Sequence, residues 1–86
     1  MKRILLIINE FDLYQYISVF DNNDTIIDFF KVTMREIPFT VCEAAKKYDI
    51  QEIDLQETEF TKKIEQRIKN KAIESYQNNN LIFKYI

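Results

Sequence analysis

Histidine, glycine and tryptophan are absent from this chain of 86 residues, and cysteine and proline occur once each. Without histidine, the commonest general base and metal ligand is missing, so neither a Ser-His-Asp nor a Cys-His nucleophile can be built. A single cysteine permits no intramolecular disulfide bond and, without histidine, no zinc site of the usual kind. We interpret Cys42 as a small buried apolar residue. These absences predict a protein that is not an enzyme and that carries no metal and no cofactor.

The absence of glycine excludes the Walker phosphate loop and the dinucleotide-binding turn, because each needs backbone positions that only glycine adopts easily. Turns must then use asparagine and aspartate, which tolerate a left-handed backbone better than the other residues do. The clearest turn of this kind is Asp21–Asn22–Asn23–Asp24. It lies between two apolar runs, so we expect a hairpin there.

The charges of the chain nearly balance, since twelve Lys and Arg residues and fourteen Asp and Glu residues give a net charge of -2. This balance excludes a strongly basic nucleic-acid binder, and nucleic acid is not an expected partner. The length and an apolar content of 47% predict a single folded domain over residues 1–86. The apolar run at residues 4–8 is too short for a secretion signal or a membrane span, so we expect a cytoplasmic location and no membrane contact.

The residue usage points to the origin of the chain. Ile, Lys and Asn, which have AT-rich codons, account for 30 residues, whereas Ala, Gly, Arg and Pro account for 7. This bias indicates an AT-rich genome, such as that of a phage or a low-GC bacterium. For a phage protein of this size, we expect the host cytoplasm as the location and an accessory or host-modulating role.

Three strands are predicted in the first third of the chain. Residues 4–8 are a solid apolar run rich in isoleucine, which is typical of a strand buried on both faces. Residues 13–20 and 25–32 are rich in the aromatic and β-branched side chains that strands favour. Because short turns separate the three runs, we expect an antiparallel meander.

A helix and a short strand are predicted next. Pro38 opens the helix, where its missing N–H costs nothing, and Asp49 ends it. Apolar residues recur at helical spacing between these two positions, as expected for a helix with one buried side. Residues 50–55 then form a short strand with polar side chains on one side only.

A second helix and a last strand complete the chain. Thr58 is the predicted N-cap of a helix that starts at residue 59 and continues to about residue 76. The run Asn78–Asn79–Asn80 breaks this helix. Residues 81–86 form the final strand.

The predicted element order is therefore β-β-β-α-β-α-β, which belongs to the α/β class. Parallel strands joined through a helix cross over right-handedly in about 98% of cases. If both crossovers move across the sheet in the same direction, both helices lie on one face. The result is a five-stranded mixed sheet in the order 3-2-1-4-5, in which only the second strand is antiparallel.

This element order resembles the ribonuclease H-like fold, the core shared by RNase H, Holliday-junction resolvases and actin-like ATPases. The resemblance covers nearly the whole chain. Nucleases of that fold bind a divalent metal between an acidic residue in or just after the first strand and another near the end of the fourth. Here Asn9 stands at the first position, with Glu10 and Asp12 beyond it, and Asp54 and Glu57 are the candidates near the fourth strand. The resemblance implies a minimal or degenerate member, and a minimal metal-dependent nuclease is the alternative function.

Both faces of the predicted sheet are apolar on four of its five strands. Two helices on one side cover only one face, so the opposite face of a half-solvated sheet should be polar. An uncovered apolar face of this size exceeds what soluble monomers usually expose. We therefore predict a homodimer, because two-fold homodimers are the commonest assemblies and tyrosine suits an interface. The predicted contact residues are Tyr14, Tyr16, Phe20, Phe83 and Tyr85.

Two alternatives stay open at this point. The aromatic residues are ordinary core if the sheet curls strongly or if the helices divide between its faces. The second helix has a basic side, which would suit a nucleic-acid-binding module, although interleaved glutamates favour a solvated, salt-bridged surface. Its cations are Lys62, Lys63, Arg67, Lys69 and Lys71. We favour a small interaction protein that associates through its aromatic sheet face, in the simplest case with itself.

Overall fold

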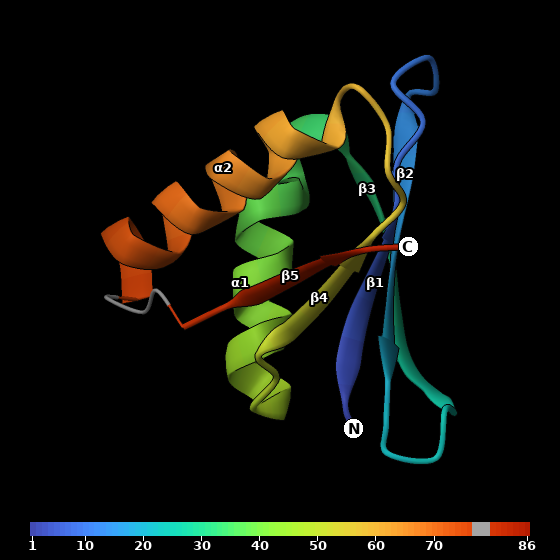
Figure 1. Cartoon of the computed structure of the whole chain (residues 1–86), viewed down its shortest axis with the longest axis vertical. Coiled ribbons are helices and arrows are strands. Elements are labelled where there is room, and N and C mark those ends of the chain that lie inside the picture. Colours follow the sequence, from blue (N-terminus) through green and yellow to red (C-terminus); the bar gives the residue numbers. More distant parts are fainter. Residues whose placement is uncertain (77–79) are drawn as a thin grey trace.

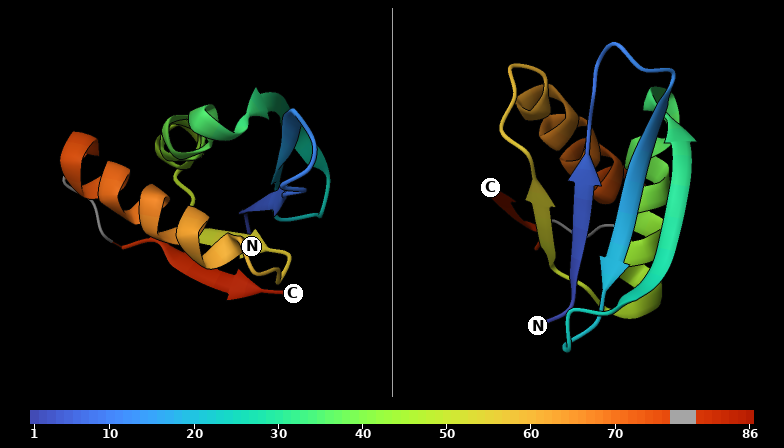
Figure 2. Two further views of the ribbon diagram at one scale, coloured as in Figure 1. Left: turned by 90° about the horizontal axis from the view of Figure 1, so that it is seen from above. Right: turned by 90° about the vertical axis from the view of Figure 1, so that its right-hand side faces the viewer.

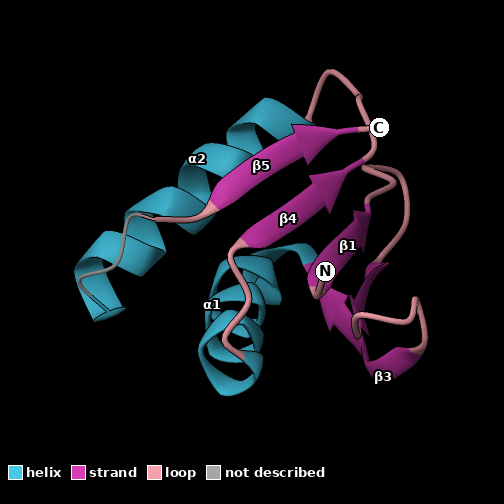
Figure 3. Cartoon of the chain, turned by 60° about the horizontal axis from the view of Figure 1, so that its bottom comes forward, coloured by secondary structure: helices cyan, strands magenta, loops and turns pink. Residues whose placement is uncertain are grey.

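The computed structural model describes residues 1–76 and 80–86 (Figure 1). Five strands form one mixed sheet, and two helices pack against it, as Figure 3 shows with the elements coloured by type. A 3-10 turn precedes the first helix, and a π-helical turn follows the second. In chain order the elements are β1 (Arg3–Ile7), β2 (Tyr14–Phe20), β3 (Ile26–Thr33), the 3-10 turn (Met34–Glu36), α1 (Ile37–Tyr48), β4 (Glu52–Leu55), α2 (Thr61–Lys71), the π-helical turn (Ala72–Tyr76) and β5 (Ile82–Tyr85).

The strand order is β3-β2-β1-β4-β5, and β2 runs antiparallel to both of its neighbours. β1 pairs with β4, and β4 with β5, in parallel register. Each of these connections passes through a helix, with α1 between β3 and β4 and α2 between β4 and β5. Both helices lie on one face of the sheet, and no described element covers the other (Figures 1 and 2). The predicted α/β class, strand order and one-sided helices are confirmed.

The hydrophobic core lies between the sheet and the two helices. Alternate side chains of the strands point into this layer, and the apolar stripes of both helices close it from the other side. Fully burying one such side chain is worth about 1.5–3 kcal/mol, so this layer dominates the stability of the fold. The core side chains with no exposed surface include Ile4, Leu6, Ile17, Ile53 and Leu55 on the sheet and Val41, Ile64 and Ile68 on the helices.

Each helix is also tied to an edge strand by a tyrosine and a carboxylate. Tyr48 of α1 donates a hydrogen bond of 2.6 Å to Asp28 of β3, and this bond holds the pKa of Asp28 below its ordinary value. Tyr85 of β5 donates a bond of 2.7 Å to Glu65 of α2. Burial and the adjacent Glu65 raise the pKa of Tyr85 to about 12.

Two aspartates replace glycine at the left-handed backbone positions that the turns require. Asp24 in the β2–β3 hairpin has a φ angle of 60°, and Asp49 at the end of α1 has a φ angle of 54°. In the hairpin, the Asp21 carboxylate accepts hydrogen bonds from the backbone N–H groups of Asn23 and Thr25. These bonds lower the pKa of Asp21, with that from Thr25 contributing most. The predicted turn and the predicted helix end are confirmed.

The β1–β2 connection differs from the prediction. Leu13 was expected to lie in the second strand, but β2 begins one residue later and Leu13 is 71% exposed. The inward position is taken by Gln15, which is 1% exposed. Its amide nitrogen donates to the carbonyls of Asn9 and Asp12, and its oxygen accepts from the Asn9 N–H. The buried amide satisfies the backbone of the loop, which an apolar side chain could not do.

The second helix also begins later than expected. Thr58 was the predicted N-cap, but α2 starts at Thr61. The Thr58 carbonyl instead accepts hydrogen bonds from the N–H and hydroxyl of Thr61, so a turn precedes the helix. The predicted break at Asn78–Asn79–Asn80 falls mostly on residues 77–79, which lie outside the described part of the chain.

Candidate interaction surface

The register of the strands fixes which side chains share the uncovered face. Side chains alternate between the two faces of a strand, and paired residues on neighbouring strands share a face. Because Ile4 and Leu6 point to the helices, the residues beside them on β1 point to the uncovered face. The side chains on this face are Arg3, Leu5 and Ile7 on β1, Tyr14, Tyr16, Ser18 and Phe20 on β2, Ile26, Phe29, Lys31 and Thr33 on β3, Glu52 and Asp54 on β4, and Ile82 and Lys84 on β5.

The half of this face over β1, β2 and β3 is apolar. Its exposed side chains range from Tyr16, at 38% exposed, to Ile26 and Phe29, both at 53%. These fractions are too high for core residues, yet well below those of isolated surface side chains such as Phe11 at 88%. We call the following residues the apolar patch: Leu5, Ile7, Tyr14, Tyr16, Phe20, Ile26 and Phe29.

Members of the apolar patch partly cover one another. The rings of Tyr16 and Phe29 stack with their centroids 5.7 Å apart and an interplanar angle of 24°. The Lys31 ammonium lies 4.5 Å from the centre of the Tyr14 ring. The Arg3 guanidinium lies 4.3 Å from the centre of the Phe20 ring on β2. Such contacts favour defined orientations of the aromatic side chains on this face.

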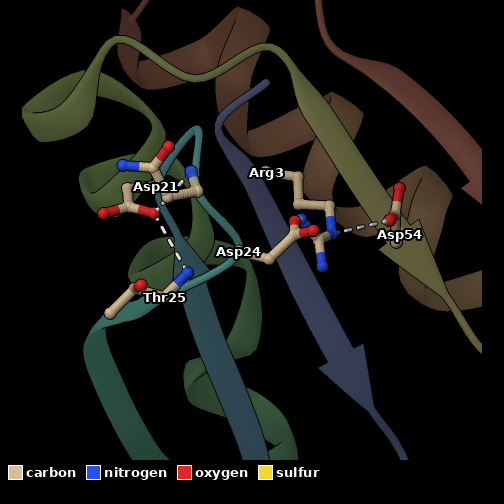
Figure 4. Close-up of polar contacts among 6 residues, drawn as sticks. Arg3, Asp21, Asp24, Thr25 and Asp54 are labelled. Carbon is tan, nitrogen blue, oxygen red and sulfur yellow. Dashed lines mark hydrogen bonds and ion pairs between the residues drawn. The ribbon is translucent and has the colours of Figure 1, made fainter.

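The rest of the face, over β4 and β5 and at Arg3 on β1, is charged. Lys84 and Glu52 form an ion pair of 2.8 Å, which lowers the pKa of Glu52. Arg3 lies between two carboxylates, with its Nε atom 3.5 Å from Asp54 and another nitrogen paired with Asp24 of the hairpin (Figure 4). We call Arg3, Glu52, Asp54 and Lys84 the charged patch. Cations and anions alternate from strand to strand across it.

Asp54 is the unusual member of the charged patch. It is 8% exposed although no described element covers its face, because longer side chains surround it. Its Oδ1 atom has no hydrogen-bond partner among the described residues. Burial raises the pKa of Asp54, and the neighbouring Glu52 carboxylate raises it further. An ionised Asp54 is therefore a cost to the folded protein.

The predicted contact residues divide between the two faces. Tyr14, Tyr16 and Phe20 lie together on the uncovered face, as expected. The expectation that Phe83 and Tyr85 share that face is wrong. The parallel register pairs them with the buried residues of β4, so they pack beneath α2 against the core.

Further members of the apolar patch were not among the predicted contacts. Ile26 and Phe29 share a face despite their odd spacing, because the register shifts between Val19 and Phe20 and leaves Ile27 as an extra residue. A bulge of this kind reverses the alternation along β3. Ile7, which was assigned to a strand buried on both faces, is 43% exposed. The alternation of side chains along a strand could have placed Ile7 on the face opposite Ile4 and Leu6. Nothing in the sequence located the bulge.

The acidic residues suggested by the resemblance to nucleases do not form one site. Asp54 lies on the uncovered face beside Arg3, whereas Glu10, Asp12 and Glu57 are exposed in loops beyond the strands. Within the described part of the chain, no group of three or more acidic, histidine or cysteine side chains could hold a metal ion. A groove of about 380 Å³ lies where β1 ends, between the loops that follow β1 and β4. Glu10 is the acidic residue among those that line it.

A basic groove of about 320 Å³ lies between the two helices. Arg67 and Lys71 of α2 line it together with Arg35 from the 3-10 turn and Phe39 of α1, whose ring is 54% exposed. None of the three cations forms an ion pair with another described residue. Glu74 lines the same groove and offsets part of the charge.

Comparisons with protein-family models, with curated proteins and with solved structures find no match to this chain. None of the helices in the described residues is long and apolar enough to span a membrane. Function is therefore inferred from the uncovered face and the basic groove.

Proposed function

We propose that this protein is a cytoplasmic, non-enzymatic interaction protein that forms a homodimer through its uncovered sheet face. The observation that supports the proposal is the apolar patch, a continuous set of half-exposed apolar side chains on three adjacent strands. Contiguous apolar patches of a few hundred Å² on soluble proteins are often interaction sites.

The charges of the same face favour a second copy over a strongly charged partner. The face carries Arg3, Lys31 and Lys84 against Glu52 and Asp54, and Asp24 of the adjacent hairpin pairs with Arg3, so the surface has no large excess of either sign. A nucleic acid would demand a basic surface, and a strongly basic partner would demand an acidic one. A balanced, largely apolar surface matches another surface of its own composition.

The expected affinity is modest. Each side chain of the apolar patch is already partly covered, so covering the rest contributes about 1 kcal/mol per side chain. Association also costs rotational and translational freedom, which removes much of that gain. We therefore expect a reversible dimer with a dissociation constant in the micromolar range.

The substitution Tyr16→Lys tests this proposal by sedimentation equilibrium. It puts a charge in the middle of the apolar patch at a position that is 38% exposed, so the fold should tolerate it. We expect the wild-type protein to dimerise as its concentration rises and the variant to stay monomeric. The control is Phe39→Lys on α1, which charges an aromatic residue that is 54% exposed in the helix layer, outside the proposed contact, and should dimerise normally. A monomeric wild-type protein at millimolar concentration would rule out the proposal.

A second candidate function is the binding of a phosphate-bearing partner in the basic groove. Arg35, Arg67 and Lys71 converge there beside the exposed Phe39 ring, a combination of cations and aromatic surface that suits phosphate and base contacts. The test is the affinity for a single-stranded oligonucleotide at several salt concentrations. We expect tighter binding at low salt and a weaker salt dependence in Arg67→Gln. Binding that does not respond to salt would count against phosphate contacts.

A further inference from the structure

We infer that the second copy sits off-centre on the uncovered face, with the two-fold axis of the dimer running along β2. This inference rests on the proposed function, because it states how the two copies of that dimer meet. It follows from the unequal halves of the face, which is apolar over β1, β2 and β3 and charged over β4 and β5.

Symmetry limits how two identical faces can meet. A two-fold axis that relates two sheets packed face to face must lie in the plane between them. In the aligned class of sheet packing, the strand directions of the two sheets stay within about 30° of each other, and we place the dimer in this class. The axis therefore runs either nearly along the strands or nearly across them.

An axis across the strands is unfavourable because it lays every strand over its own copy. β4 would then face β4, and an axis that crosses at the level of Leu5 and Phe29, near the middle of the apolar patch, would set Asp54 opposite Asp54. On β5, Lys84 would face Lys84. Like charges placed opposite one another at an interface oppose association.

An axis along β1, the central strand, is also unfavourable. It avoids the contact of β4 with β4 but lays β4 over the second copy's β2. Glu52 and Asp54 would lose water against Phe20 and Ser18 of the second copy, and Arg3 would face its own copy on the axis. Asp54 already has one carboxylate oxygen without a hydrogen bond, so further drying would add to its cost.

An axis along β2 places apolar side chains on apolar side chains. β2 then lies over β2, and β1 lies over the second copy's β3. The register sets Leu5 opposite the second copy's Phe29, while Tyr16 lies on the axis and meets its own copy. Lys31 sits on the edge strand, from which its ammonium group can reach water. β4 and β5 project beyond the contact, so Glu52, Asp54 and Lys84 remain hydrated at the rim, as in most protein interfaces, whereas Arg3 on β1 lies over Ile26 of the second copy.

The size of this contact agrees with a weak dimer. β2 has seven residues, and three strands at spacings of about 4.8 Å with a rise of about 3.3 Å per residue cover roughly 330 Å² in projection. Counted on both partners this is roughly 660 Å², to which side-chain roughness and the flanking loops add, and it falls below the ~1,200–2,000 Å² of standard interfaces, in the range of weak, transient contacts.

The test uses pairs of variants with opposite charges at one position. Only a residue on the two-fold axis meets its own copy, so Tyr16→Lys and Tyr16→Glu should each weaken the dimer by about tenfold or more. Mixing the two variants should restore association, with the mixed dimer about tenfold tighter than either homodimer. Sedimentation equilibrium of each variant and of the equimolar mixture measures these constants.

The matched control applies the same charges off the axis. Phe29→Lys and Phe29→Glu should each weaken the dimer, and their mixture should not recover, because position 29 faces Leu5 rather than itself. Circular dichroism of each variant checks that the fold is intact. If either Tyr16 variant does not fold, the same pair at Tyr14, which also lies on β2 and is 43% exposed, replaces it.

The outcomes separate the two claims. Recovery at Tyr16 without recovery at Phe29 supports an axis along β2. A wild-type dimer with no recovery at Tyr16, or with equal recovery at Phe29, overturns this axis and leaves the proposed function standing. A wild-type protein that is monomeric at every concentration overturns both.

Discussion

The two faces of the sheet are built from the same five strands, yet they differ in almost every property. On the face beneath the helices, Leu6 and its neighbours have no exposed surface. On the opposite face, Ile7 and Tyr16 are 43% and 38% exposed, and charged residues occupy the half over β4 and β5. A one-residue step along a strand therefore moves a side chain from the core to the surface that we propose for association.

This difference assigns separate tasks to the two faces. The covered face supplies most of the stability, because its apolar side chains are completely removed from water. The uncovered face adds little to the stability of the monomer and determines what the protein can bind. Substitutions at neighbouring positions should therefore have unequal effects on folding and on association.

The largest contrast is expected between Leu6 and Ile7. Leu6→Ala removes a fully buried side chain and should lower the free energy of unfolding by about 3 kcal/mol. Ile7→Ala removes a side chain that is 43% exposed and should cost about 1 kcal/mol or less. Urea denaturation of both variants, at concentrations where the protein is monomeric, measures the two values. Similar costs at the two positions would show that the faces do not differ as described.

A smaller effect is expected from Tyr48→Phe, which removes the hydrogen bond from α1 to Asp28. The folded-state pKa of Asp28 is lowered, so this bond stabilises the fold above the ordinary aspartate pKa and is lost as the pH falls through the lowered value. We expect a cost of about 1 kcal/mol near neutral pH, given that the site is partly exposed. Denaturation at several pH values should show this cost shrinking below about pH 4. A cost that is the same at every pH would contradict the role of the ionised Asp28.

The smallest effect is expected from Asp54→Asn on the uncovered face, which should raise the stability of the fold rather than lower it. The folded-state pKa of Asp54 is raised, so the fold is favoured while the carboxyl keeps its proton and loses that advantage as the pH rises through the raised value. Asp54→Asn cannot ionise and should therefore be more stable than the wild-type protein at neutral pH, by about 1 kcal/mol or less. Thermal unfolding at acid and neutral pH measures the difference, which should disappear in acid. A destabilised variant at neutral pH would mean that the ion pair with Arg3 outweighs the cost of burial.

The sequence predicted the arrangement of the elements well because strong local signals determine it. The apolar run at residues 4–8, the Asp21–Asp24 turn and Pro38 each limit the local backbone, and the handedness of crossovers then leaves few strand orders. The uncovered face was harder to predict. Along β5, apolar side chains occur on both faces, so the sequence does not reveal whether Ile82 or the pair Phe83 and Tyr85 faces the helices. For this reason Phe83 and Tyr85 were placed on the wrong face.

Two further features depend on contacts between distant segments. The bulge opposite Val19 and Phe20 arises from the pairing of β2 with β3, and no residue type marks it in the sequence. The burial of Asp54 arises because Arg3, Glu52 and Lys84 come together only when β1, β4 and β5 pair. Local patterns therefore predicted the strands but not the details of the surface they form.

The most direct test of the central claim is a dilution series followed by two-dimensional amide NMR. If a second copy covers the apolar patch, the signals of β1, β2 and β3 should shift with concentration, with the largest changes at Tyr16 and Ser18. The signals of α1 and α2 should stay constant, since the helices lie on the far side of the sheet. Shifts confined to the helices, or no shifts up to millimolar concentration, would contradict the account.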